Sequence, residues 1–203
     1  IGFVLGPCIN ASGRLATAKR ALELLDTKEE ALARSRAMEL KRLNEERKNM
    51  TEQGLARAIE QIEQSRQKED RVLVVYLPDC HESLAGIIAG KIREHYYRPV
   101  FVLTRGEEAV KGSGRSIETY SMFEEMSKCK DLFLKYGGHP MAAGLSLPEE
   151  NVEEFRRRIN EECSLTEEEL TEVIRIDIAL PFSHVSEKVV EELELLEPFG
   201  NGN

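Results

Sequence analysis

The sequence lacks the features that would place a protein in a membrane or an oxidising compartment. Its four cysteines, Cys8, Cys80, Cys129 and Cys163, lie far apart and form no CxxC pair, which argues against a zinc site and a disulfide framework. No apolar run approaches the roughly 20 residues that span a bilayer. The opening IGFVLGPCIN has neither a basic n-region nor a cleavage site. We therefore expect a cytoplasmic protein with free, reduced thiols and no membrane partner.

Sequence signatures of several enzyme classes are also missing. There is no Walker loop, no GxSxG and no dinucleotide fingerprint. No set of aspartates and histidines is suited to hold one or two divalent cations, which limits any claim of hydrolysis. The sequence thus predicts no metal ligand and no catalytic residue in this chain. It begins at Ile1 without a methionine and ends in the turn-rich EPFGNGN, so we expect a piece of a longer protein.

The net charge of −9 at first argues against an anionic partner, but the charge is unevenly distributed. Residues 1–70 carry 13 basic and 12 acidic groups, residues 71–144 carry 10 and 9, and residues 145–203 carry 5 and 16. The acidic excess therefore lies in the last segment, and the middle of the chain remains available to an anionic ligand. Charge alone would not suggest DNA.

The first third of the chain is predicted to be helical. Residues 17–25 form a short helical pattern, and Thr27 with Glu30 three positions later predicts a capping box that starts a second helix. From 28 to 67 there is no proline, one glycine and a broken helical spacing of apolar residues among many charges. A helix of this length with a thin apolar stripe is typical of a link between two bodies, whereas a coiled coil is disfavoured by polar a and d positions.

An α/β pattern follows. VLVVYL (72–77) predicts a buried strand, residues 83–97 a helix and PVFVLT (99–104) a second strand, which together indicate a parallel pair. Residues 109–117 predict a strand that ends in a glycine-broken turn, residues 121–129 a helix, residues 141–147 another strand and residues 149–162 an amphipathic helix. VIRIDIAL (173–180) alternates as a half-buried strand does, and VSEKVVEELELLEPF predicts a final helix that runs into Gly200. This acidic end is expected to begin another domain.

Two glycine-rich stretches hold the candidate ligand-binding residues. In KGSGRSI, hydroxyls, backbone N–H groups freed by glycine and a planar guanidinium suit an oxyanion; the residues are Gly112, Ser113, Gly114, Arg115 and Ser116. In GGHPMAAG, Gly137 and Gly138 let a ligand approach the backbone, and His139 can donate to a phosphate or a base edge. A solvated turn and a structural histidine are the alternatives, but a shared anionic ligand explains both stretches together.

The stretch DCHES lies between the first predicted strand and its helix, on the usual ligand side of a parallel sheet. Asp79, His81 and Glu82 are metal ligands in principle. Three adjacent residues rarely converge on one ion, so the favoured interpretation is a polar loop with a helix cap at Ser83.

Together these stretches resemble a known family. GPCINASGRL (6–15) is similar to the segment that closes the catalytic domain of RecJ-type single-stranded-DNA-specific exonucleases, in the DHH phosphoesterase superfamily. HESLAGIIAGKIREHYYRPVFVLT, KGSGRSI and KYGGHPMAAGLSL resemble, in order and spacing, the DHH-associated domain of the same enzymes. LLEPFGNGN looks like the start of a motif near the family's OB-type domain. The resemblance covers nearly the whole chain.

The resemblance implies an α/β fold in which a long linker helix precedes a small mixed-sheet domain. It divides the chain into the end of the catalytic domain (1–16), a helical linker (17–69), the DHH-associated substrate-binding domain (70–164) and the start of an OB-like domain (165–203). It also implies 5′ to 3′ hydrolysis of single-stranded DNA with Mn²⁺ or Mg²⁺ in repair and recombination. The metal-binding motifs of such enzymes lie upstream, so this portion is expected to be inactive alone. Family partners include a single-stranded-DNA-binding protein and a RecQ-type helicase.

Residue by residue, the resemblance makes the two glycine-rich stretches the grip on the DNA backbone, with Asn10, Arg14 and His81 as further candidates. Cys80 stands where family members often carry tryptophan, which puts an aromatic base-stacking contact there in question. Two alternatives remain open. One is a phosphodiesterase for cyclic dinucleotides or short oligonucleotides, since such relatives share the DHH-associated domain. The other is a non-catalytic nucleic-acid-binding or scaffold module.

Overall fold

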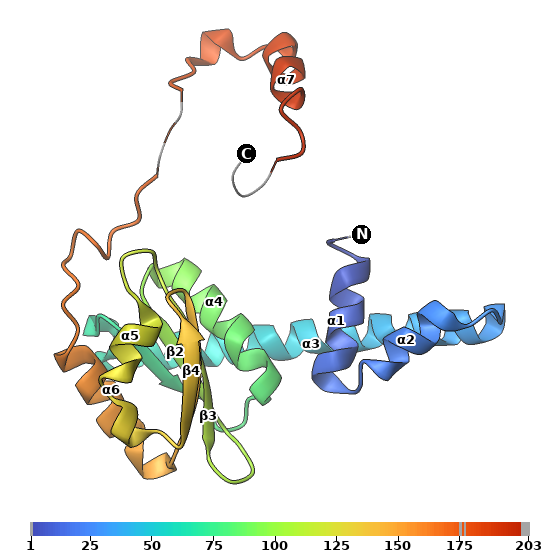
Figure 1. The fold of residues 1–203 in the computed structure, drawn as a ribbon. Helices are drawn as coiled ribbons and strands as arrows, with labels where there is room; N and C mark the ends of the chain where they lie inside the picture. Colours follow the sequence, from blue (N-terminus) through green and yellow to red (C-terminus); the bar gives the residue numbers. More distant parts are fainter. Residues whose placement is uncertain (1, 175, 177, 200–203) are drawn as a thin grey trace. The chain divides into compact units, whose positions relative to one another are not determined.

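The computed structural model describes residues 2–174, 176 and 178–199, and they divide into two units, Ile1–Thr171 and Glu172–Asn203. The first unit holds a helical arm and a five-stranded mixed sheet with helices on both faces (Figure 1). Its α-helices and strands are α1 Leu5–Leu15, α2 Lys19–Asp26, α3 Glu30–Gln64, β1 Leu73–Tyr76, α4 Ala85–Tyr96, β2 Val100–Arg105, β3 Val110–Arg115, α5 Met122–Ser127, β4 Lys135–His139, β5 Ala142–Leu147 and α6 Val152–Glu161. Short 3₁₀ turns add η1 Arg66–Glu69, η2 Glu82–Leu84, η3 Lys130–Leu132 and η4 Glu149–Asn151.

Helix α3 links the arm to the sheet, as the sequence predicts. Its 35 residues give a length of about 50 Å. Leu40 and Leu43 pack with α1 and α2, whereas Ala58 and Ile62 belong to the core beneath α4. The predicted capping box does not form, because α3 begins at Glu30 with Glu29 as its N-cap. Thr27 Oγ1 instead accepts a hydrogen bond from the backbone N–H of Glu29.

The sheet has the strand order β1-β2-β3-β5-β4, with β1 and β2 parallel and the other neighbours antiparallel. Because side chains alternate across a strand, β1 and β2 feed two cores. Val74 and Phe101 pack toward α5 and α6, whereas Val75 and Val102 pack toward α3 and α4. The continuous apolar runs that predicted these two strands therefore reflect burial on both faces.

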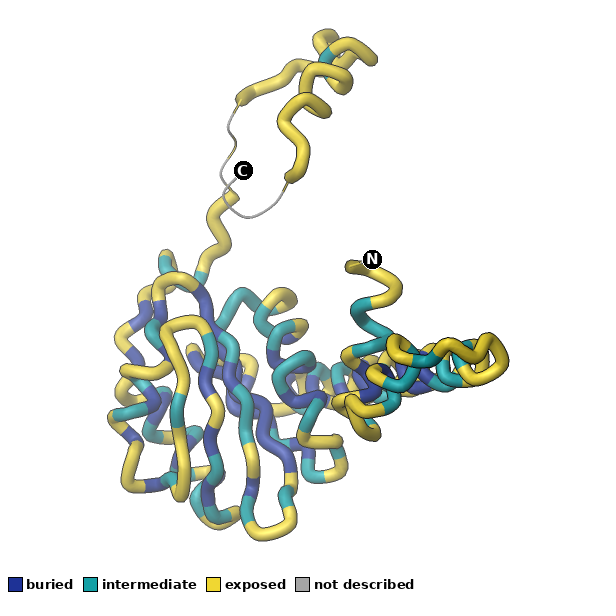
Figure 2. The backbone as a smooth tube through the Cα atoms, turned by 45° about the vertical axis from the view of Figure 1, so that its right-hand side comes forward, coloured by how far each residue is buried: buried dark blue, intermediate teal, exposed yellow. Residues whose placement is uncertain are grey.

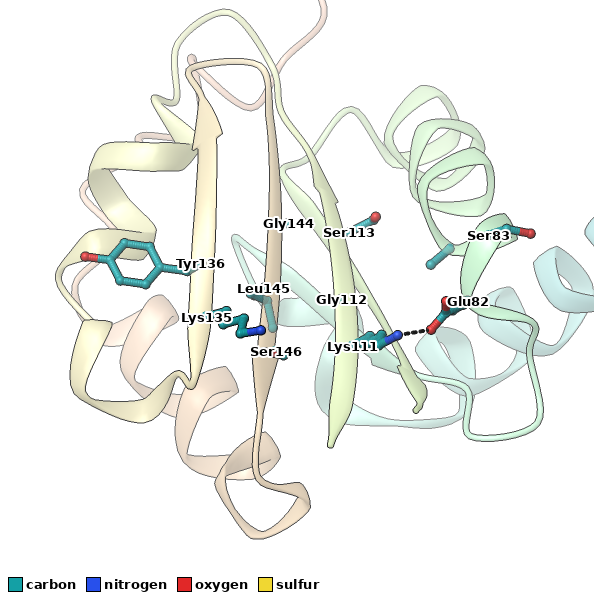
Figure 3. Close-up of a pocket in the computed structure, with 11 residues that line it drawn as sticks. Glu82, Ser83, Lys111, Gly112, Ser113, Lys135, Tyr136, Gly144, Leu145 and Ser146 are labelled. Atoms are coloured by element: carbon teal, nitrogen blue, oxygen red, sulfur yellow. Dashed lines mark ion pairs between the residues drawn. The ribbon is translucent and has the colours of Figure 1, made fainter. Parts of the chain in front are cut away.

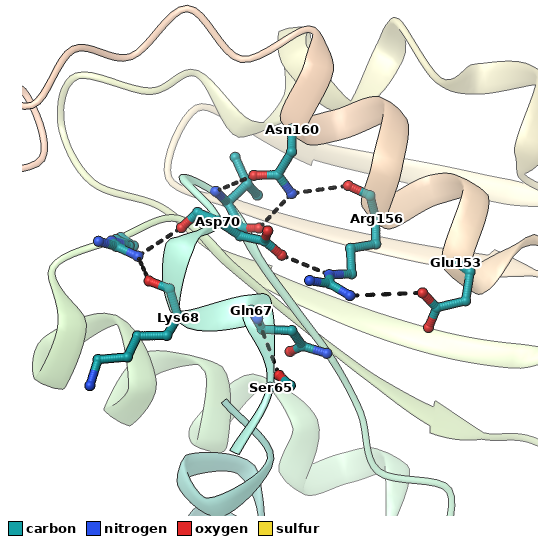
Figure 4. A network of polar contacts seen from close by, with 9 residues as sticks. Ser65, Gln67, Lys68, Asp70, Glu153, Arg156 and Asn160 are labelled. Atoms are coloured by element: carbon teal, nitrogen blue, oxygen red, sulfur yellow. Dashed lines mark hydrogen bonds and ion pairs between the residues drawn. The ribbon is translucent and has the colours of Figure 1, made fainter. Parts of the chain in front are cut away.

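A side-chain clamp completes the outer edge of β1. Asn160 of α6 accepts a hydrogen bond from Val72 N–H and donates one to Val72 C=O, at 3.0 and 2.9 Å (Figure 4). One turn earlier, Arg156 Nε donates to Asp70 Oδ2 at 2.7 Å. The amide satisfies backbone groups that an edge strand otherwise presents to solvent, so α6 is locked to the start of the sheet.

Both glycine-rich stretches lie in strands, so the strand predicted over 109–117 is present but the glycine-broken turn predicted within it is not. Gly112 and Gly114 lie inside β3, and Gly137 and Gly138 lie inside β4. None of these glycines has a left-handed φ. Glycine is therefore present at these positions because neighbouring atoms pack closely there or because the surface is left open, and not because the backbone turns.

The second unit contains η5 Phe182–His184 and α7 Glu187–Glu194, and its described residues are almost all exposed (Figure 2). The strand predicted over 173–180 is not formed by the described residues of that segment: Val173, Ile174, Ile176 and Ile178 are 70–80% exposed. An alternating pattern makes a strand only where a neighbouring strand supplies hydrogen bonds, and these residues pair with none among those described. The final GNGN of the motif, with Gly200, lies outside the described residues.

Candidate functional site

On one face of the sheet, residues of β3, β5 and β4 line an open groove of about 440 Å³ beside η2 and the start of α4 (Figure 3). Directly opposed residues of antiparallel strands point to the same face. The registers therefore place nine residues in three cross-strand rows: Lys135, Ser146 and Lys111; Gly137, Gly144 and Ser113; His139, Ala142 and Arg115. Successive rows are two residues, or about 6.8 Å, apart along the strands.

Two guanidinium groups, those of Arg115 and Arg14, lie near the third row. A Cβ placed on Gly86, in the first turn of α4, would lie 2.7 Å from Arg115 Nη2, so Arg115 rests on this bare backbone. Arg14, from the end of α1, donates from Nη1 to the carbonyl of Ser83 at 2.7 Å, one turn away. Burial lowers the pKa of Arg115, and the neighbouring charge of Arg14 lowers it further. Neither side chain forms an ion pair with a carboxylate among the described residues, which leaves a local positive charge suited to an anion.

His139 stands at the other end of the same row. Its Nδ1 accepts a hydrogen bond from the backbone N–H of Met141 at 3.3 Å. In this arrangement the ring proton is on Nε2, which is therefore a donor on an exposed side chain. Arg115 and His139 thus offer donors from two strands on one face.

Two glycines in the middle row are not required by packing. A Cβ on Gly137 would meet nothing within 4 Å, and one on Gly144 would meet only the carbonyl oxygen of Gly112, at 3.9 Å. Alanine at either position would therefore fit the protein and project into the groove. Bare backbone along the floor of a groove is what a ligand that lies close to the sheet needs.

Comparison with known proteins places the chain in a family. Residues 69–165 match the DHHA1 domain. The chain is 37% identical over 204 residues to the single-stranded-DNA-specific exonuclease RecJ of Bacillus subtilis, covering 98% of this chain and 26% of that protein. It superimposes on a crystal structure of Thermus thermophilus RecJ in complex with Mg²⁺ with a TM-score of 0.87 and 34% identity, covering 99% of this chain and 31% of the other.

This chain belongs to the RecJ-type family. It spans about a quarter to a third of the length of the RecJ proteins that it matches. The predicted fold class, a long helix followed by a small mixed α/β sheet domain, is confirmed by the RecJ structure. The OB-like domain predicted to begin at residue 165 stays a prediction, because the described helices and strands do not test it.

Other predicted site residues lie away from the groove. Ser116 is buried, and its hydroxyl donates to the carbonyl of Tyr120 at 2.6 Å. Gly114 faces the core, where a Cβ would lie 2.9 Å from Phe101 Cε1. Gly138 points to the same side as Gly114, and a Cβ there would lie 2.7 Å from Ala143 Cα. These three positions support the strands that carry the groove residues.

The remaining candidates have local roles or free surfaces. Asn10 is exposed on α1, one turn before Arg14. His81 is the N-cap of η2: its Nδ1 accepts from the backbone N–H of Ser83 at 3.3 Å and lies 2.8 Å from the Ser83 hydroxyl. The cap predicted at Ser83 is therefore made by His81. Among the described residues no three of His, Cys, Asp and Glu lie close enough to hold a metal ion, so those residues do not fit the metal centre that the family implies.

Sequence reasoning missed the first row, which adds two lysines and a hydroxyl to the groove. Lys111 Nζ is 2.6 Å from Glu82 Oε2, and this contact raises the pKa of Lys111 (Figure 3). Lys135 and Ser146 complete the row. Their positions follow from strand alternation and from the register of β3, β5 and β4, which the sequence alone does not give.

Proposed function

We propose that this chain is the strand-holding part of a single-stranded-DNA exonuclease, and that the groove binds the DNA backbone. The observation that supports this most is the pair of guanidinium groups of Arg14 and Arg115, which lie at Ser83 and Gly86, beside the groove, and have no carboxylate partner among the described residues. Phosphate is the natural ligand for such a pair because a guanidinium can bond two of its oxygens at once.

The shape of the groove favours an extended strand. Donors recur at each row, and successive rows are separated by a distance close to that between phosphates of an extended single strand. The glycine row allows the strand to lie near the sheet. Phosphate contacts fix position without reading sequence, in keeping with an enzyme that degrades any strand.

The chain's contribution to the reaction is to bind and orient. Correct positioning of a reactant lowers a large part of the barrier of a hydrolysis. RecJ relatives bind Mg²⁺ or Mn²⁺ in their structures, and we expect the complete protein to use such ions for 5′ to 3′ hydrolysis in repair and recombination. The ligands would come from elsewhere in the longer protein, so the chain alone is expected to bind DNA without cutting it. We also expect the complete protein to be cytoplasmic and to work with partners such as a single-stranded-DNA-binding protein. No helix among the described residues is long and apolar enough to span a bilayer.

The proposal is tested by fluorescence anisotropy with a labelled single-stranded oligonucleotide at several salt concentrations. Arg115→Ala should weaken binding about 10- to 100-fold, as expected for one hydrogen-bonded charge. It should also reduce the slope of log affinity against log salt by about 0.7. Arg34→Ala is the matched control, since Arg34 is an exposed arginine on α3 that pairs with Glu30.

The same titration separates the alternatives. His139→Ala should weaken strand binding as well, because it removes the donor at the opposite end of the row. If a cyclic dinucleotide binds and the strand does not, the phosphodiesterase alternative replaces this proposal. If Arg115→Ala and Arg34→Ala bind the strand equally well, the groove is not the DNA site.

A further inference from the structure

A second cavity, of about 350 Å³, lies between α3 and the segment that connects β1 to α4. Helix α3 contributes Met50, Gln53, Gly54 and Arg57, and the connecting segment contributes Leu77, Pro78, Asp79, Cys80, His81 and Leu84. The volume is within the range of sites that bind small ligands. None of the residues that line the groove lines this cavity.

The lining of the cavity is apolar at its base and polar at its rim. Leu84 and Leu77 are 0% and 7% exposed, and Met50 packs against the same core. The polar groups include the amide of Gln53, the guanidinium of Arg57 and the carboxylate of Asp79. None of these three side chains forms a hydrogen bond or ion pair with another described residue. An apolar slot edged by both donors and acceptors suits a heteroaromatic ring whose edge carries both kinds of group.

Two small residues lie side by side in the wall of this cavity. A Cβ on Gly54 would lie 2.6 Å from Ile88 Cδ1 and 3.6 Å from Cys80 Sγ, so Gly54 is packed closely against Ile88 and contacts Cys80. Burial raises the pKa of the Cys80 thiol, which keeps the thiol neutral. Cys80 therefore acts as a small apolar group in the wall and not as a nucleophile.

The cavity and the groove share the turn η2. Glu82 and Ser83 line the groove, whereas His81 and Leu84, on either side of them, line the cavity. A strand whose backbone follows the groove thus passes within one turn of the cavity.

We propose that this cavity binds one nucleobase of the single-stranded DNA that the groove holds, with the ring against Met50 and Leu77 and its edge toward Gln53 and Asp79. This inference rests on the proposed function. Because apolar side chains would contact the face of the base, which all bases share, the site should accept any base, with preferences set by the size of the ring.

Methionine methyl NMR gives a direct test, because Met50 is in the cavity and Met122 and Met126 lie in the core on the opposite face of the sheet. The chain is labelled at methionine ¹³C-methyl groups, and Met50 is assigned with Met50→Leu. Titration with 2′-deoxyadenosine 5′-monophosphate should shift the Met50 signal upfield and saturably, through the ring current of the base. The signals of Met122 and Met126 should not move. Deoxyribose 5-phosphate, which lacks the base, should leave Met50 unchanged.

Variants at Cys80 give the matched pair. Cys80→Trp should fill the cavity and raise the Kd for the mononucleotide at least about 10-fold, whereas Cys80→Ser, of nearly the same size, should change it by less than about twofold. Equal binding by both variants would overturn the inference, as would an equal Met50 shift from the sugar phosphate.

The two proposals fail in different ways. Arg115→Ala tests the groove with the oligonucleotide, whereas the mononucleotide tests the cavity. If the oligonucleotide binds through Arg115 and leaves Met50 unmoved, the base site is wrong and the strand-holding function stands. If the mononucleotide shifts the Met50 signal but Arg115→Ala leaves the affinity for the oligonucleotide unchanged, the base site stands and the groove assignment is wrong.

Discussion

Gly114 of β3 pairs with Ala143 of β5, and the next residue of β5, Gly144, pairs with Ser113 of β3. Although the two glycines lie close together, alanine should have opposite effects on the stability of the protein at the two sites. At Gly114 a Cβ would lie 2.9 Å from Phe101 Cε1 and overlap the sulfur of Met122. Both neighbours are fully buried. Overpacking of this kind costs about 1–3 kcal/mol, so Gly114→Ala should lower the Tm by roughly 2–12 °C for a chain of this size.

At Gly144 the added methyl group would point into the groove, where the nearest atom is 3.9 Å away. Its φ is not left-handed, so alanine is compatible with the strand and reduces the entropy of the unfolded chain. Gly144→Ala should therefore keep or raise the free energy of unfolding by up to about 1 kcal/mol. It should nevertheless weaken strand binding, because the methyl group stands between the DNA and the sheet.

Thermal unfolding followed by circular dichroism and oligonucleotide anisotropy, measured on both variants, give the comparison. Stability should fall only for Gly114→Ala, and affinity at a temperature where both variants are folded should fall mainly for Gly144→Ala. A Gly144→Ala protein that binds the strand with unchanged affinity would show that the strand does not lie on the middle row. An unfolded Gly144→Ala protein would show that the open face is occupied by the protein itself.

Three further outcomes follow from the same contacts. Asn160→Ala should lower the free energy of unfolding in urea by about 1–3 kcal/mol, because it leaves the backbone N–H of Val72 without a partner, whereas Asn151→Ala, which removes a single hydrogen bond to the carbonyl of Leu132, should cost less. Glu82→Gln should release Lys111 for phosphate, tighten strand binding several-fold at low salt and steepen the salt slope by about 0.7; unchanged salt dependence would count against the first row. Tyr96, whose pKa burial and a hydrogen bond to a carboxylate raise to about 12, should ionise after an exposed tyrosine in an absorbance titration. Since the folded state holds this proton more tightly, stability should fall as the pH rises from about 10 to 12, and Tyr96→Phe should remove that part of the fall.

The parallel pair and the long helix were predictable because the local pattern and the final environment agree. VLVVYL and PVFVLT are apolar on both faces, and both faces of β1 and β2 are covered. Likewise, the thin stripe of α3 serves two separate cores, at Leu40 and at Ile62. Here burial produces a pattern that can be read without knowledge of the partner elements.

The groove was not predictable in the same way. Glycine was interpreted as a sign of turns, yet the glycines of β3 and β4 have ordinary strand geometry and differ only in what surrounds them. Whether a glycine supports packing, as Gly112 does beneath Leu145, or exposes backbone, as Gly137 does, depends on residues distant in sequence. Lys111 and Lys135 could be recognised only after the strand register was known.

The arm and the sheet depend on each other for the charge at the groove. Arg14 belongs to α1, which packs on α3, and α3 packs on α4, whose first turn carries Gly86 beneath Arg115. The hydrogen bond from Arg14 to the carbonyl of Ser83 is thus the far end of a chain of contacts that begins in the arm. A change that loosens α1 from α3 would separate the two guanidinium groups without altering either one. If the groove holds a strand as proposed, its affinity should therefore depend on the arm as well as on the sheet, and α3 is the element that keeps both in one unit.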